Sequence, residues 1–201
     1  MIRCLLFVSL ITLSIHALAQ GISEEERDFA KKYLMESGEQ LLATTRQLTE
    51  EQLRFKPAPD QWSILECIAH IGIVEEIVWG NIQEALKTPV SAEDIAQKFS
   101  PDDMIIKRLE SRKGKAKAPE RLQPGDLDGR TYEKVLEDFL FKRGRLLSFL
   151  ESSEADLRAH LYGNPLGNLD LYQWMLFVSA HTVRHTLQIQ EVRDCQEFPV
   201  N

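Results

Sequence analysis

Three of the five histidines in the sequence are spaced as a metal site would require. His181 and His185 lie four residues apart, and helical residues i and i+4 stack on one face about one turn apart. Two imidazoles held in this way can chelate one ion. His70, which lies in a separate apolar segment, would complete a three-histidine set. Such a set leaves at least one coordination position open, which is typical of reactive sites rather than closed structural ones.

The donor type narrows the chemistry of such a site. Imidazole nitrogen suits zinc, nickel or iron, whereas calcium and magnesium prefer oxygen ligands. The ion would polarise a substrate or activate water near neutral pH. Thr182 stands where a zinc protease carries its general base, and Glu66 lies one turn before His70 on a neighbouring line, so the sequence names no base.

The remaining histidines and two glutamines are not predicted to be metal ligands. Gln173 and Gln188 share the broad face of the last helical segment and could contact the ligands or a substrate, but we favour ordinary polar positions at the rim. His16 lies in the N-terminal leader. His160 lies in a polar stretch that we expect to be exposed, so neither histidine joins the site.

Four long segments, which carry apolar residues at spacings of three and four, are predicted to position the histidines. These segments run from Ser23 to about Thr45, from Ser63 to Leu86, from about Thr131 to Leu150, and from about Asp170 to Asp194. The first two open with Ser-x-x-Glu capping boxes. His181 and His185 occupy inward positions of the last segment. His70 faces away from Glu75 and Glu76, which we expect in solvent.

These segments predict an all-α fold, a four-helix bundle without a strand. The short connection between the first two helices makes them antiparallel. The irregular stretch at 88–130, in which Ser91 and Ser100 each open a candidate short helix, is long enough to cross the length of the bundle. Helices two and three would then run parallel. The predicted order is up-down-down-up.

The N-terminus predicts export. Arg3 precedes a mostly apolar run at 4–15, and Ala17-Leu18-Ala19 matches a signal-peptidase site. We therefore expect residues 1–19 to be a cleaved signal peptide, residues 20–201 to form one domain, and the mature protein to be periplasmic or secreted. The apolar run is short for a membrane span, although an uncleaved anchor is the alternative.

Charge, cysteine content and one basic run bear on nucleic-acid binding, disulfide formation and anion binding. The net charge of −7 becomes −8 when Arg3 is removed, which argues against nucleic acid as a partner. Cys67 and Cys195 can pair in an oxidising compartment, but Cys67 lies in an apolar helix where we expect simple burial. The basic run at 112–117 suits either an anion site or a solvated loop, and we favour the loop because no Gly-rich phosphate motif accompanies it.

Two segments resemble the DinB-like proteins. The family motif contains Leu-(Ser/Thr)-x-x-x-Leu, a proline, Trp-Ser-Ile-x-Glu, and a histidine four residues after the glutamate. The sequence matches it at Leu48–Leu53, at Pro57 and at Trp62–His70. The closing helix is similar at Leu171–Trp174 and at Ala180–His185. The likeness covers most of the mature chain, and it leaves out the loop at 88–130.

The resemblance implies a four-helix bundle with one divalent metal ion held by His70, His181 and His185. It also implies a homodimer, since many members dimerise. Characterised relatives include transferases and isomerases that use cytoplasmic thiols, which fits an exported chain poorly. We therefore expect an exported metal-dependent enzyme, hydrolase-like or thiol-transferase-like, acting on a small molecule that the sequence does not name. The alternatives are a non-catalytic bundle that binds metal or a small ligand, and a structural bundle with metal-free buried histidines.

Overall fold

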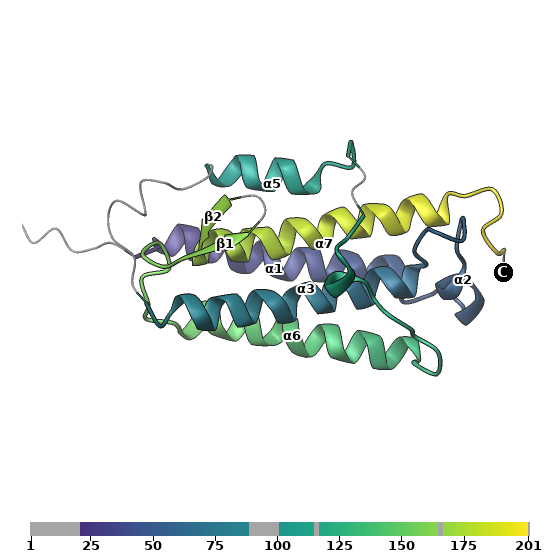
Figure 1. Ribbon diagram of the computed structural model, residues 1–201, viewed down its shortest axis with the longest axis horizontal. Helices are drawn as coiled ribbons and strands as arrows, with labels where there is room; N and C mark the ends of the chain where they lie inside the picture. The colour runs from purple at the N-terminus through teal and green to yellow at the C-terminus, as the bar shows by residue number, and fades with distance from the viewer. Residues whose placement is uncertain (1–20, 89–100, 115–116, 165–166, 201) are drawn as a thin grey trace, which may run out of the picture.

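Four long helices form the body of the protein in a computed structural model that describes residues 21–88, 101–114, 117–164 and 167–200. They are α1 (Glu24–Thr45), α3 (Ile64–Ala85), α6 (Tyr132–Ser152) and α7 (Leu171–Arg193). Figure 1 shows α1 and α7 running in one direction and α3 and α6 in the other. The predicted four-helix bundle and its up-down-down-up order are confirmed.

Capping groups explain why the long helices begin where they do. Ser23, Ser63 and Asp170 each accept a hydrogen bond from the backbone of the third helical residue, and the side chain of that residue accepts one in return. Each capping box satisfies backbone N–H groups that would otherwise lack partners at the end of the helix. Thr131 caps α6 through its side chain alone.

The connections between the long helices contain shorter elements. A short helix, α2 (Glu50–Arg54), lies between α1 and α3. The connection between α3 and α6 contains α5 (Asp102–Glu110), close to the start predicted at Ser100, and the 3-10 turn η1 (Glu120–Leu122). Figure 1 shows α5 on the outside of α7, with η1 in front of α3. The candidate helix start at Ser91 lies outside the described residues.

The expectation of no strand is wrong. β1 (Leu161–Asn164) and β2 (Gly167–Asp170) pair as an antiparallel hairpin, with Leu161 opposite Asp170. Gly167 has φ of 114°, a conformation that residues with a side chain rarely adopt. Four-residue strands next to a turn carry too little alternation to be separated from a loop by pattern alone. The hairpin leads directly into the capping box of α7.

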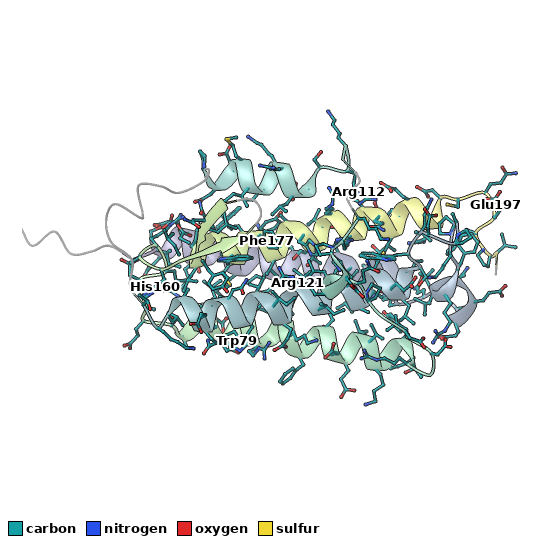
Figure 2. The ribbon with its side chains drawn as sticks, in the orientation of Figure 1. Trp79, Arg112, Arg121, His160, Phe177 and Glu197 are labelled. Atoms are coloured by element: carbon teal, nitrogen blue, oxygen red, sulfur yellow. The ribbon has the colours of Figure 1, made fainter. Side chains whose placement is uncertain are left out.

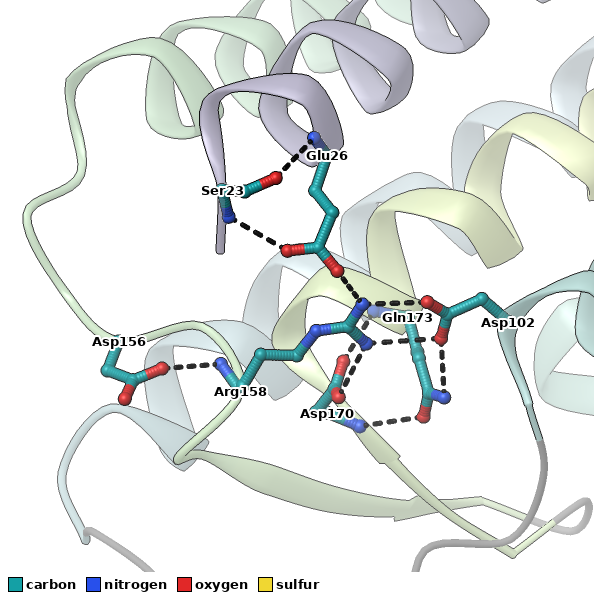
Figure 3. A network of polar contacts seen from close by, with 7 residues as sticks. All are labelled: Ser23, Glu26, Asp102, Asp156, Arg158, Asp170 and Gln173. Atoms are coloured by element: carbon teal, nitrogen blue, oxygen red, sulfur yellow. Dashed lines mark hydrogen bonds and ion pairs between the residues drawn. The ribbon is translucent and has the colours of Figure 1, made fainter. Parts of the chain in front are cut away.

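One arginine joins the starts of several elements (Figure 3). Arg158 contacts Glu26 of α1 at 2.5 Å, Asp102 of α5 at 2.7 Å and Asp170, the N-cap of α7, at 3.0 Å. The Gln173 amide also donates to Asp102 at 2.8 Å. Gln173 therefore belongs to the helix start. This network anchors α5 at the end of the bundle where α1 and α7 begin.

The buried apolar residues form two clusters along the bundle. One contains Leu34, Val78, Leu146 and Val178, and the other contains Leu41, Ile68, Phe139 and Ile189. Each cluster takes residues from all four long helices, so both ends of the bundle exclude water from apolar surface.

Two further expectations concern cysteines and membranes. Cys67 is buried on α3, as expected, and both Cys67 and Cys195 are free thiols. No helix within the described ranges is long and apolar enough to cross a membrane. The predicted signal peptide at 1–19 lies outside those ranges, so its cleavage and export stay predictions.

Candidate functional site

The three predicted histidines meet at one point between α3 and α7. The Nε2 atom of His181 lies 3.2 Å from Nε2 of His70 and 3.1 Å from Nε2 of His185. One nitrogen from each ring lies within 4.8 Å of the other two. His70 and His185 are buried, and His181 is partly exposed.

Local sequence explains the placement of His70. The capping box of Ser63 and Glu66 starts α3 just before the site, and Glu66 also contacts the Lys56 ammonium at 2.7 Å. The indole of Trp62 lies against the His70 ring, with centroids 4.6 Å apart. Both oxygens of Glu66 thus have structural partners, which accounts for its place in the motif without giving it a role as a base.

Outer-shell contacts orient the rings of His70 and His185. The main-chain oxygen of Leu122 lies 2.6 Å from Nδ1 of His70, and Oε1 of Gln188 lies 3.0 Å from Nδ1 of His185. An oxygen acceptor places the imidazole proton on Nδ1, which leaves Nε2 as an unprotonated ligand atom. Ligand histidines in metal sites are usually held by such contacts.

Arg112 supports the orientation of Gln188. Its Nη1 donates to Oε1 of Gln188 at 3.4 Å, and its other nitrogens contact the Glu191 carboxylate at 2.7 and 2.9 Å. Two donors therefore converge on the same amide oxygen, which fits an acceptor facing His185. Figure 2 shows Arg112 beside α7 and Arg121 at the η1 turn in front of the bundle.

The segment that holds Arg112 is bound to α7 by a second arginine. Arg184 donates to the main-chain oxygens of Ser111 and of Gly114, the latter at 2.5 Å. Within the basic run at 112–117, Arg112 is therefore bound to α7, whereas Lys113 and Gly114 are exposed, as expected for a solvated loop. Residues 115–116 lie outside the described ranges.

The donor geometry fits a transition-metal ion. When His70 and His185 carry their protons on Nδ1, each has a lone pair on Nε2. Both lone pairs face Nε2 of His181, and that nitrogen can donate only one proton. At least one buried nitrogen would lack a partner, at a cost of about 1–3 kcal/mol. A tetrahedral ion about 2.0–2.1 Å from each nitrogen would separate the nitrogens by about 3.3 Å, close to the two spacings of 3.1 and 3.2 Å that involve His181.

Burial lowers the pKa of all three histidines. For His70, the hydrogen bond to Leu122 opposes this effect in part. For His181, burial is joined by both other histidines and by nearby arginines, and its pKa lies well below the usual range. For His185, burial, His70 and nearby arginines outweigh the hydrogen bond to Gln188, so its pKa also lies well below the usual range. Neutral imidazoles are the form that binds metal ions.

Aromatic rings cover two sides of the cluster. The Phe177 ring lies parallel to His181, at an interplanar angle of 7° and a centroid distance of 5.8 Å. The Trp62 ring lies 6.1 Å from that of His185. Phe177 is labelled in Figure 2 on the N-terminal half of α7. These rings limit the rotation of the imidazoles.

Several predictions for the surrounding residues need correction. Glu75, expected in solvent, is 1% exposed and bound to Arg143, whereas Glu76 is exposed as expected. Gln188 is a partner of His185 rather than an ordinary rim residue. His160 is only partly exposed, with Nδ1 3.0 Å from the oxygen of Ala85, and it lies outside the cluster as predicted.

The Leu122 contact was not predicted. A main-chain oxygen has no signature in the residue type, so the sequence offered no signal for it.

Comparisons with known proteins identify the family and agree with the fold. Residues 33–189 match the DinB superfamily. The uncharacterized protein YuaE of Bacillus subtilis is 26% identical over 151 residues, which are 73% of this chain and 86% of YuaE. YfiT of Bacillus subtilis, described as a probable metal-dependent hydrolase with an unusual four-helix bundle topology, superposes with a TM-score of 0.53 at 15% identity. The superposition covers 87% of this chain and 89% of YfiT. By its sequence match over most of its length, the chain belongs to the DinB superfamily.

Proposed function

We propose that the protein is a metal-dependent enzyme of hydrolase or transferase type. One divalent transition ion, zinc, nickel or iron, would be held by His70, His181 and His185. The observation that carries the proposal is the convergence of one nitrogen from each ring within 4.8 Å, with Nε2 of His181 3.2 and 3.1 Å from Nε2 of the other two and too few protons to satisfy all three. The description of YfiT as a probable metal-dependent hydrolase supports the hydrolase class.

The chain's own groups have definite tasks in this function. Leu122 and Gln188 keep a proton on Nδ1 of His70 and of His185, so that both rings present Nε2 to the ion. Trp62 and Phe177 exclude water from two sides of the cluster. An ion bound there supplies Lewis acidity toward a substrate oxygen or sulfur atom.

A non-catalytic bundle that binds metal or a small ligand is the second candidate. The engagement of Glu66 favours it, because the carboxylate nearest to His70 in the motif is occupied by the helix cap and by Lys56. A hydrolase would then have to take its proton acceptor from the substrate or from solvent.

Turnover separates the two candidates. The metal-loaded protein is assayed on panels of esters, amides and thiol conjugates, before and after treatment with a chelator. His181→Ala serves as the site variant and His160→Ala as the matched control. An enzyme shows turnover that the chelator and His181→Ala abolish and that His160→Ala retains. Metal-loaded protein without turnover on any panel would favour the binding bundle, and turnover that the chelator leaves unchanged would contradict the proposal.

We also propose export. The positive start, the apolar run at 4–15 and Ala17-Leu18-Ala19 support it. N-terminal sequencing of protein made in a secreting host should read from Gln20. Intact Met1 in the recovered protein would contradict cleavage.

A further inference from the structure

A buried layer of polar side chains crosses the bundle, and each long helix contributes one residue. Arg143 of α6 lies at its centre. Its guanidinium donates to Oε1 of Glu75 on α3 at 2.5 and 3.0 Å, to Oγ of Ser37 on α1 at 3.0 Å, and to Oγ1 of Thr182 on α7 at 2.7 Å. It also donates to the main-chain oxygen of Leu34. All four side chains of this layer, which we call the Arg143 layer, are at most 4% exposed.

The Arg143 layer separates the two apolar clusters. On α3, the residues up to Ile71 belong to one cluster and those from Val74 onward to the other. On α7, the division falls between Val178 and Ile189. His181 and His185 come from the dividing stretch of α7, and His70 lies beside Ile71, at the end of the first cluster on α3. The histidine cluster is therefore adjacent to the Arg143 layer.

Apolar packing alone would leave the position of each helix along the bundle axis poorly specified. Many sliding arrangements bury similar apolar area, whereas a buried charge must meet its partner or remain uncompensated. Burial raises the pKa of Glu75, and the Arg143 charge opposes that effect. Buried polar groups are best attested as devices that fix the register of packed helices.

Thr182 connects this layer to the site. It lies next to His181 in the sequence and is fully buried, while His181 is partly exposed. The hydrogen bond from Arg143 to Thr182 thus ties the histidine-bearing turn of α7 to Glu75, which lies five residues after His70 on α3. A shift of α7 along its axis would break this bond and separate the Nε2 atoms.

We propose that Arg143 and Glu75 are positioning residues for the metal site. Through Thr182 they fix the position of α7 along the bundle axis relative to α3. This inference rests on the proposed metal binding. It predicts that the network determines the affinity for the ion independently of the stability of the fold.

Zinc binding by the full chain tests the inference. Glu75→Leu combined with Arg143→Met replaces both charges, so no uncompensated charge remains in the core. We expect the far-ultraviolet circular dichroism to stay helical and the zinc affinity, measured by chelator competition, to fall about tenfold. The visible spectrum of the cobalt-loaded protein, which reports ligand geometry, should change as well. Thr182→Val, which removes the bond from Arg143 together with the bond from Thr182 to the Val178 oxygen inside α7, should give a smaller loss of affinity in the same direction.

Leu150→Ala is the matched control. It opens a cavity further along α6 and destabilises the fold without touching the layer, so zinc affinity should stay at the wild-type value. A folded double variant with wild-type affinity would overturn the inference, as would an equal loss in Leu150→Ala. If the double variant does not fold, wild-type affinity in Thr182→Val overturns it. Wild-type protein that binds no zinc would instead remove the proposed function itself.

Discussion

The Nδ1 atom of His70 lies 2.6 Å from the main-chain oxygen of Leu122, 52 residues further along the chain. This contact joins a ligand on α3 to η1, in the connection between α5 and α6. The same connection reaches His185 through Arg112 and Gln188. The connection between α3 and α6 therefore contacts the outer nitrogen of His70 directly and supports the partner of the outer nitrogen of His185.

Replacing one ligand histidine should remove most of the stabilisation that zinc gives to the folded protein. His181→Ala leaves two donors, so zinc should raise the thermal midpoint of this variant far less than that of the wild type, because ligand binding to the folded state stabilises it. Calorimetry with and without zinc checks this. His160→Ala, a histidine outside the cluster, should keep the full zinc-dependent shift; equal shifts in wild type and His181→Ala would show that His181 is not a ligand.

Loss of the Gln188 amide should weaken metal binding without unfolding the protein. Gln188→Leu removes the acceptor for Nδ1 of His185, and loss of such outer-shell partners costs about 10- to 100-fold in metal affinity. Chelator competition measures the change. Gln190→Leu, two residues further along α7, should bind zinc as the wild type does. Unchanged affinity in Gln188→Leu would mean that the amide does not orient the ring.

Acidification should destabilise the metal-free protein through the three histidines. Burial lowers their pKa in the folded state, so below about pH 6.5 the unfolded chain binds more protons than the folded one. Their contribution to stability is complete above that pH and is lost as the pH falls toward the lowered values. Urea denaturation at a series of pH values measures it.

A variant without the three histidines is the control for this pH dependence. Carboxylates contribute their own slope at lower pH, so the comparison is with the triple variant His70→Leu, His181→Leu and His185→Leu. The free energy of unfolding of that variant should change less between about pH 7 and pH 5 than that of the wild type. Parallel curves would show that the histidines do not carry the effect.

Arg158 should be important for stability. Arg158→Gln removes the charge that Glu26, Asp102 and Asp170 share, and we expect a loss of about 2 kcal/mol in the free energy of unfolding. Lys134→Gln removes the same charge from an exposed pair with Glu137 and should have little effect. Chemical denaturation compares the two, and equal losses would contradict a special role for the Arg158 network.

Much of the fold was predictable because its signals are local. The capping boxes and the apolar spacing predicted the starts of all four long helices to within a residue or so, and the connection lengths predicted their directions. The three histidines were predicted to form one site because the i, i+4 spacing puts His181 and His185 on one inward face and His70 lies on a second apolar helix, within the motif that resembles the DinB-like proteins.

The remaining features depend on distant partners. Glu75 resembles Glu76 in its local sequence, and only Arg143, 68 residues away, explains why one is buried and the other exposed. The local sequence of Gln188 is that of a rim residue, and only its contacts with Arg112 and His185 show what its amide oxygen does. The hairpin before α7 was missed because each of its strands has only four residues.

Metal content tests the central claim most directly. Elemental analysis of protein purified without a histidine tag, after incubation with zinc, nickel or iron and removal of unbound ions, should give about one ion per chain, as a single three-histidine site requires. His181→Ala treated in parallel should retain much less. Wild-type protein that holds none of these ions, or that holds as much as His181→Ala, would contradict the assignment of His70, His181 and His185 as a metal site.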